Sequence, residues 1–221
     1  MYTIQVGSFV LNGQILLFFA FGMAGWAALR SYERKMKWKY ELGAISFQAF
    51  LIWLLVWKGS LLLWEPASVI QQPLSLVYFD GGVKGRWAAS LSVIGYLFYH
   101  LIKRKMSFLM VAEAATIYLL GGLTVYDLGL SWFVPEQKLT LLATSALSIL
   151  IVLSFLLAEG QILWTGLVER GLWLCIGLVA IGFLNSNRVS VFLSFDFLQI
   201  AGIAAAGGLY LILSLLKRRD L

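Results

Sequence analysis

Seven apolar runs dominate the chain, and short polar segments separate them. Each run, alone or with its flanking residues, reaches the roughly 20 residues that a helix needs to cross the hydrocarbon core of a bilayer. The runs are Leu11–Leu29, Leu42–Trp64, Trp87–Ile102, Phe108–Phe133, Leu139–Leu157, Leu172–Leu184 and Leu198–Leu216. The third and the sixth run are short, so their ends are the least well defined. The pattern predicts an all-α, polytopic membrane helix bundle with seven transmembrane helices.

The composition requires a lipid environment. The chain is 61% hydrophobic and 13% charged, with a mean hydropathy of +0.86, whereas a soluble domain is about 45–50% apolar and about 25% charged. No linker or internal repeat interrupts the pattern, so residues 1–221 are expected to form a single integral membrane domain. Met1–Ser8 has no basic n-region, and the first apolar run is therefore expected to be retained as a helix.

The basic residues predict the orientation of this bundle. The net charge is +6, and the positive groups cluster beside the apolar runs, which is typical of a membrane protein rather than of a nucleic-acid binder. The clusters follow the first, third and seventh runs: Arg30, Arg34, Lys35, Lys37 and Lys39; Lys103, Arg104 and Lys105; Lys217, Arg218 and Arg219. Because cytoplasmic loops carry the excess of lysine and arginine, the N-terminus is expected outside and the C-terminus in the cytoplasm.

Three charged residues fall inside the runs, where they are costly and therefore candidates for function. Lys58 lies about two turns from the outer end of its run, where it either reaches the headgroups or meets an anion. Glu113 and Asp127 are 14 residues apart in one run, which places them on one helix face about 21 Å apart. They are too distant for an acid–base pair, and Asp127 is expected to form an ion pair with Lys58, Lys84 or Arg86.

The candidates for metal or cofactor chemistry are few. His100 is the only histidine and lies beside the cytoplasmic basic cluster, and Cys175 is the only cysteine. A histidine or cysteine metal site is therefore not expected, and we expect no cofactor.

A polar, glycine-rich segment, Pro73–Arg86, stands between the second and third runs at the predicted outer face. Its Pro-Leu-Ser-Leu start and its Asp80-Gly81-Gly82 centre resemble a motif of the bacterial prolipoprotein diacylglyceryl transferases. Further matches to that family are Ile4–Ser8, Pro135–Gln137, Asn185–Arg188 and Phe197–Ile200. The resemblance implies a seven-helix protein of the bacterial cytoplasmic (inner) membrane. Such enzymes transfer a diacylglyceryl group from phosphatidylglycerol to a cysteine thiol at the outer leaflet.

The resemblance fails at the residues that carry the family's chemistry. Glu113 matches the family's acidic residue in the fourth span, and Arg188 matches its last arginine. The family's important histidine falls on Arg86, and an essential arginine falls on Asp127. A glutamate position of the family is Asn185, and a second arginine position is Ile181. The family's outer head domain, between the fourth and fifth spans, is reduced to Val134–Lys138.

These substitutions bear on the reaction, which needs cations for the glycerol phosphate and a base for the thiol. An arginine cannot be that base because its guanidinium stays protonated. Arg86 and Asp127 remain the catalytic candidates. The resemblance assigns headgroup binding to Lys58, Lys84, Arg86, Arg188, Gly81 and Gly82. Structural polar roles are expected for Glu113, Asn185 and Gln199.

Three functions therefore stay open. The first is a diverged, non-catalytic relative that binds anionic phospholipid, with phosphatidylglycerol expected, or serves as an accessory subunit with a membrane protein partner. The second is an active transferase with a rearranged site. The third is a small transporter or channel in which Lys58, Glu113 and Asp127 line a polar route, although no broken-helix pair or inverted repeat supports it.

Overall fold

The computed structural model describes residues 3–6, 9–38, 40–64, 66, 82–158, 163–185 and 189–219. Seven long helices make up most of this part of the chain. They are α1 (Gly13–Met36), α2 (Leu42–Trp64), α5 (Gly82–Lys103), α6 (Phe108–Phe133), α7 (Lys138–Leu157), α8 (Trp164–Gly182) and α9 (Phe197–Arg219). A short 3-10 helix, η1 (Pro135–Gln137), connects α6 to α7. Most of the glycine-rich segment, residues 73–81, lies outside the described residues.

Six of the seven helices in the described part are long and apolar enough to cross a membrane, and the chain is a multi-pass membrane protein. The exception is α5, the helix expected to be the third span. Its 22 residues give sufficient length. Polar residues such as Ser90, Ser92 and His100 are spread along it and lower its mean hydropathy. The expected third span is therefore not among the helices that meet the length and composition of a membrane span.

Several element boundaries differ from the prediction; α1, for example, ends at Met36 rather than Leu29. A two-stranded antiparallel sheet, β1 (Thr3–Val6) with β2 (Phe9–Asn12), precedes the first helix, which begins at Gly13 rather than Leu11. Both strands are rich in β-branched or aromatic residues, which favour strands. The sixth span also begins earlier than its apolar run, at Trp164, so two charged residues lie inside α8.

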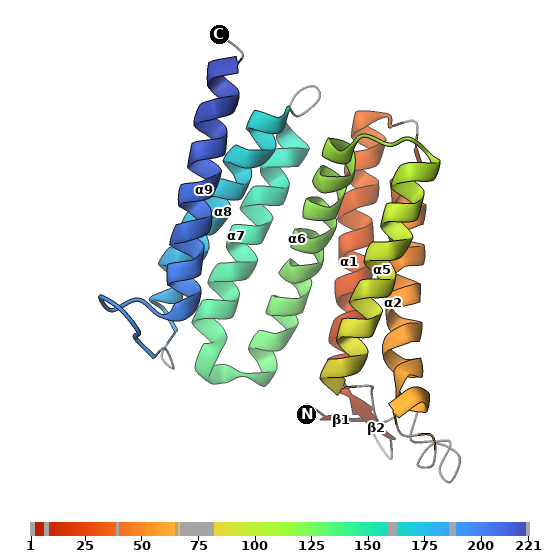
Figure 1. Ribbon diagram of the computed structural model, residues 1–221. Coiled ribbons are helices and arrows are strands. Elements are labelled where there is room, and N and C mark those ends of the chain that lie inside the picture. The colour runs from red at the N-terminus through yellow and green to blue at the C-terminus, as the bar shows by residue number, and fades with distance from the viewer. Residues whose placement is uncertain are drawn as a thin grey trace.

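The contacts between helices form one row, in the order α5, α2, α1, α6, α7, α8 and α9. In Figure 1, α5 lies in front of α1 and α2, and α6, α7, α8 and α9 follow on the other side of α1. The most extensive contact is between α1 and α6 near the centre of the row, and α8 with α9 comes next. The two edge helices, α5 and α9, each pack mainly against one neighbour. The row therefore consists of a packed centre, α1 with α6 and α7, and two edge pairs, α2 with α5 and α8 with α9, which join the centre by less extensive contacts.

The helix termini in the described chain gather at two opposite ends of the bundle. The basic end is where α1, α5 and α9 finish and where α2, α6 and α8 begin (Figure 1). The described basic clusters predicted to share one side of the membrane all lie there, including Lys35, Lys103 and Lys217. The hairpin, the start of α5 and the α6–α7 turn lie at the opposite end, which we call the hairpin end (Figure 1).

Small residues bring α1 and α6 close enough for their backbones to touch. A Cβ added to Gly25 would lie 2.5 Å from the Tyr118 carbonyl oxygen. A Cβ added to Gly122 would lie 2.8 Å from the Phe21 carbonyl oxygen. Backbone atoms cannot move aside, so the approach requires glycine at both positions. Close packing through small residues is a main source of helix association in lipid, where burial of apolar surface gives little.

Replacing Gly25 by alanine should therefore destabilise the bundle. Overpacking of this kind costs about 1–3 kcal/mol, which exceeds the gain in helix propensity of at most about 1 kcal/mol. Gly95→Ala is the matched control, because Gly95 in α5 has no atom within 4 Å of its added Cβ. The measurement is the unfolding temperature of both purified variants in one detergent. Equal unfolding temperatures for the two variants would contradict the close α1–α6 contact.

Candidate functional site

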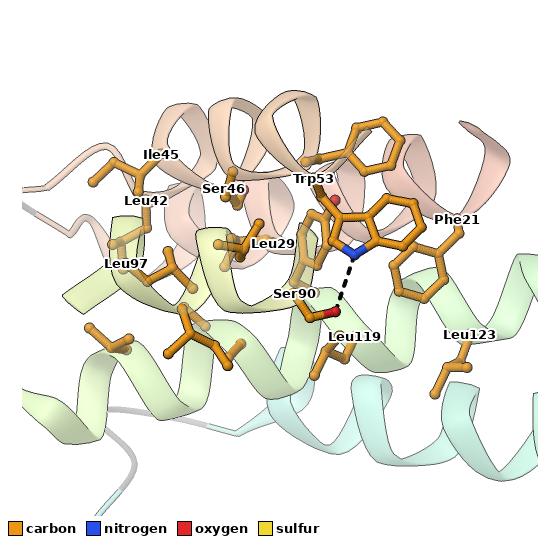
Figure 2. A pocket seen from close by; sticks show the side chains of 18 of the residues that line it. Phe21, Leu29, Leu42, Ile45, Ser46, Trp53, Ser90, Leu97, Leu119 and Leu123 are labelled. Atoms are coloured by element: carbon orange, nitrogen blue, oxygen red, sulfur yellow. Dashed lines mark hydrogen bonds between the residues drawn. The ribbon is translucent and has the colours of Figure 1, made fainter. Parts of the chain in front are cut away.

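A large apolar cavity lies between α1, α2, α5 and α6. Its volume is about 810 Å³, in the upper part of the range typical of ligand pockets. It forms because α5 packs on α2 and makes little contact with α6 across the space. Figure 2 shows aliphatic side chains such as Leu97, Leu119 and Leu123 around it.

Each helix presents one face to this cavity. On α5 the lining residues include Arg86, Ser90, Val93 and Leu97, which recur at the three- and four-residue spacing of a single helix face. On α6 the lining extends from Val111 to Tyr126. Fifteen residues of helix correspond to about 22 Å, so the cavity follows the membrane-spanning direction over most of the apolar depth.

The charged group of the cavity lies toward the hairpin end, whereas the other polar groups, such as Ser46 and Ser90, are spread along it. Of the described residues that line it, only Arg86 is charged, and its side chain is exposed. One turn further along α5, Ser90 Oγ lies 3.4 Å from the indole nitrogen of Trp53, which donates a hydrogen bond (Figure 2). Arg86 makes no hydrogen bond or ion pair with another described residue. Among the described residues, therefore, nothing pairs with this guanidinium, which lies at one end of the apolar cavity.

The other candidate headgroup residues do not gather around Arg86. Lys84 precedes it by two residues on α5, which turns the two side chains to nearly opposite faces. The Lys84 ammonium lies 5.4 Å from the centre of the Trp64 ring. Lys58 on α2 is half-buried, 5.7 Å from the Trp57 ring centre, and does not line the cavity. Gly82 begins α5 with a φ of 60°, which favours glycine. Gly81 and Arg188 lie outside the described residues.

Asp127 does not form the ion pair expected from the sequence. Its carboxylate accepts a hydrogen bond of 2.6 Å from the Thr144 hydroxyl of α7. None of the described basic side chains is within salt-bridge distance of it. The cause is the helix period: the preceding residue, Tyr126, faces the cavity, and one step along α6 turns Asp127 toward α7. The two catalytic candidates, Arg86 and Asp127, thus lie on different faces of the bundle.

Glu113 belongs to a polar cluster near the basic end. Its side chain is 4% exposed and accepts a hydrogen bond from the Tyr32 hydroxyl of α1. Tyr32 is fully buried and packs edge-on against Phe155 of α7. The guanidinium of Arg170, from α8, lies close enough to Glu113 for an electrostatic interaction. The cluster joins α1, α6, α7 and α8, and none of its four side chains lines the cavity described above.

Gln199 and Asp196 close the first turn of α9 by reciprocal hydrogen bonds. The backbone nitrogen of Gln199 donates to Asp196 Oδ1 at 2.7 Å, and that of Asp196 donates to Gln199 Oε1 at 2.9 Å. Such a capping arrangement satisfies two backbone donors at a helix start. The Gln199 amide also donates to the Val179 carbonyl of α8. Asn185 lies just beyond α8, where its backbone nitrogen donates to Gly182.

Sequence reasoning missed two features of these sites. The first is Arg170, which the apolar pattern assigned to the flank of a run, although a charged residue so close to a run was a usable signal. The second is the cavity itself, whose α5 wall shows the three- and four-residue spacing. His100, considered for metal binding, packs between the rings of Tyr96 and Tyr99 at the basic end. No group of three or more metal-ligating side chains occurs among the described residues.

Comparison with protein-family models, with curated proteins and with solved structures finds no match.

Removal of the Tyr32 hydroxyl should destabilise the protein, because it leaves the buried Glu113 carboxyl without its partner. An orphaned buried polar group costs about 1–3 kcal/mol. Tyr32→Phe is therefore expected to lower the midpoint of unfolding, as followed by circular dichroism in detergent. Tyr99→Phe is the control, since the Tyr99 hydroxyl accepts an exposed hydrogen bond from Lys103. A midpoint for Tyr32→Phe no lower than that of the control would show that this bond does not stabilise the fold.

Proposed function

We propose that this membrane protein binds an anionic phospholipid, with phosphatidylglycerol as the expected lipid, in the cavity between α1, α2, α5 and α6. The acyl chains would lie along the apolar walls, and the phosphate would lie against Arg86. The observation that carries the proposal is one cation without a described protein partner at the end of a long apolar cavity. The positive end of the α5 dipole lies in the same turn and also favours an anion.

The dimensions of the cavity support a lipid rather than a small polar ligand. Its lining is almost entirely aliphatic and aromatic, and its length of about 22 Å suits an extended acyl chain. The orientation predicted from the basic clusters would place Arg86 in the outer leaflet of a bacterial cytoplasmic membrane. The resemblance to the prolipoprotein diacylglyceryl transferases supports the same lipid and the same leaflet.

The distribution of the polar residues favours binding without catalysis. Arg86 offers a guanidinium, which is a hydrogen-bond donor and not a base for a thiol. Asp127, the other candidate, is directed toward Thr144 at the α6–α7 contact and does not line the cavity. We therefore place this protein among non-catalytic relatives of the transferases, with a role as an accessory subunit of a membrane complex. The transporter alternative has less support, because neither Glu113 nor Asp127 lines the cavity.

Arg86→Gln should weaken phosphatidylglycerol binding by about tenfold or more, since a charge-assisted hydrogen bond contributes about 1.5–3 kcal/mol. Binding is measured by native mass spectrometry of the delipidated protein titrated with phosphatidylglycerol. Lys84→Gln is the matched control, because it removes the same charge from the same end of α5 but from another face. Equal weakening of phosphatidylglycerol binding by both substitutions would show that general surface charge causes the effect. Unchanged binding in Arg86→Gln would contradict the proposed site.

The non-catalytic assignment predicts that the protein does not transfer a diacylglyceryl group. Purified protein is mixed with labelled phosphatidylglycerol and a cysteine-bearing acceptor peptide, and the peptide is expected to stay unlabelled. An active diacylglyceryl transferase in the same mixture shows that the assay works. Labelling that is abolished by Arg86→Ala or Asp127→Asn would replace the binding proposal with the rearranged transferase.

A further inference from the structure

A second cavity lies near the basic end of the bundle, between α6, α7, α8 and α9. Its volume is about 660 Å³. Its α8 wall runs from Trp164 to Leu174 along one helix face, and α9 contributes Leu209, Ile212 and Leu216. None of its lining residues is shared with the first cavity. The two spaces are therefore separate and lie on opposite sides of the α6–α7 contact along the helix row.

Arg170 is the one charged side chain among the described residues that line this second cavity. Its Nε donates to Ser154 Oγ at 2.9 Å, and its two terminal nitrogens donate to the carbonyl oxygens of Ser154 and Gly166 at 3.0 Å. The guanidinium also lies 4.7 Å from the centre of the Phe155 ring. These contacts fix the group in place before any ligand arrives.

The groups that hold Arg170 leave its charge and part of its hydrogen-bonding capacity available. All three acceptors are neutral, and a guanidinium has five N–H donors. The hydrogen bonds to Ser154 and Gly166 use three of these N–H donors, so each terminal nitrogen keeps one. A bidentate contact with a phosphate requires such a pair of N–H donors. The carboxyl in electrostatic range is Glu113, which is hydrogen-bonded to Tyr32. The two charged side chains form no ion pair within 4.0 Å.

The surroundings determine which ligand fits a fixed cation in the wall of an apolar space, where Trp164 and Leu167 precede Arg170 and Leu174 follows it on α8. Lys217 and Arg218 follow directly after the cavity residue Leu216 on α9, and both are exposed. Basic residues at a helix end attract anionic lipid, and basic pockets between membrane helices bind anionic headgroups. We propose that this cavity is a second lipid site, which takes an anionic phospholipid from the leaflet at the basic end and holds its phosphate on Arg170.

The experiment counts bound lipids. The full chain is delipidated in detergent and titrated with phosphatidylglycerol or with phosphatidylcholine of the same acyl chains, and complexes are resolved by native mass spectrometry. The protein is expected to bind two phosphatidylglycerol molecules tightly. Arg170→Gln should lose one of them, and Arg86→Gln should lose the other. If only Arg86→Gln loses a bound phosphatidylglycerol, the second site is overturned. If only Arg170→Gln loses one, the first site is overturned and the second stands.

Arg170→Gln also removes hydrogen bonds within the protein, so a second variant separates binding from folding. Gly171 lines the cavity beside Arg170, and a Cβ added there would make only an ordinary contact, 3.4 Å from Leu209. Gly171→Leu should fill the space, keep the hydrogen bonds of Arg170 and remove one bound phosphatidylglycerol. An unchanged lipid count in this variant, or equal binding of phosphatidylcholine, would overturn the proposal even if Arg170→Gln failed to fold.

Discussion

The close approach of α1 and α6 is the contact on which the rest of this bundle depends. Glycines at Gly25 and Gly122 allow backbone to meet backbone, and the other helices are added outward from this pair on both sides (Figure 1). In lipid there is little hydrophobic gain from helix association, so dense packing must hold the centre. The buried bond between Tyr32 and Glu113 joins the same two helices nearer the basic end.

The two cavities follow from the same arrangement. A single row of helices gives each edge helix only one extensive neighbour, so space opens where an edge helix and a central helix fail to meet. The first space lies between α5 and α6, and the second lies where α9 passes α6 and α7. Each contains one arginine, Arg86 or Arg170, and otherwise apolar or uncharged walls. The bundle thus offers similar chemistry twice, near opposite ends.

Apolar runs located the helices well because length and hydropathy are properties of local sequence. The predictions failed where tertiary packing determines the structure. The sixth apolar run did not include Arg170. In the structure α8 includes this residue, and Ser154 and Gly166 accept hydrogen bonds from its guanidinium. The ion pair expected for Asp127 depended on which face of α6 meets which neighbour, and helix period alone does not give the neighbour. The spacing of its α5 wall indicates one helix face, but the cavity itself arises where α5 makes little contact with α6, which local sequence does not specify.

The position of α5 at the edge of the row has a kinetic consequence. Its firm attachment is to α2, where Gly85 lies against Ser60 and Trp57 and where Ala89 is fully buried. Its boundary with α6 is the wall of the first cavity. Under the lipid-binding function proposed above, a lipid that enters this cavity from the bilayer would have to part α5 only from α6, and the packed α1–α6 centre would stay intact. The residence time of that lipid would then depend on one peripheral helix rather than on the stability of the whole fold.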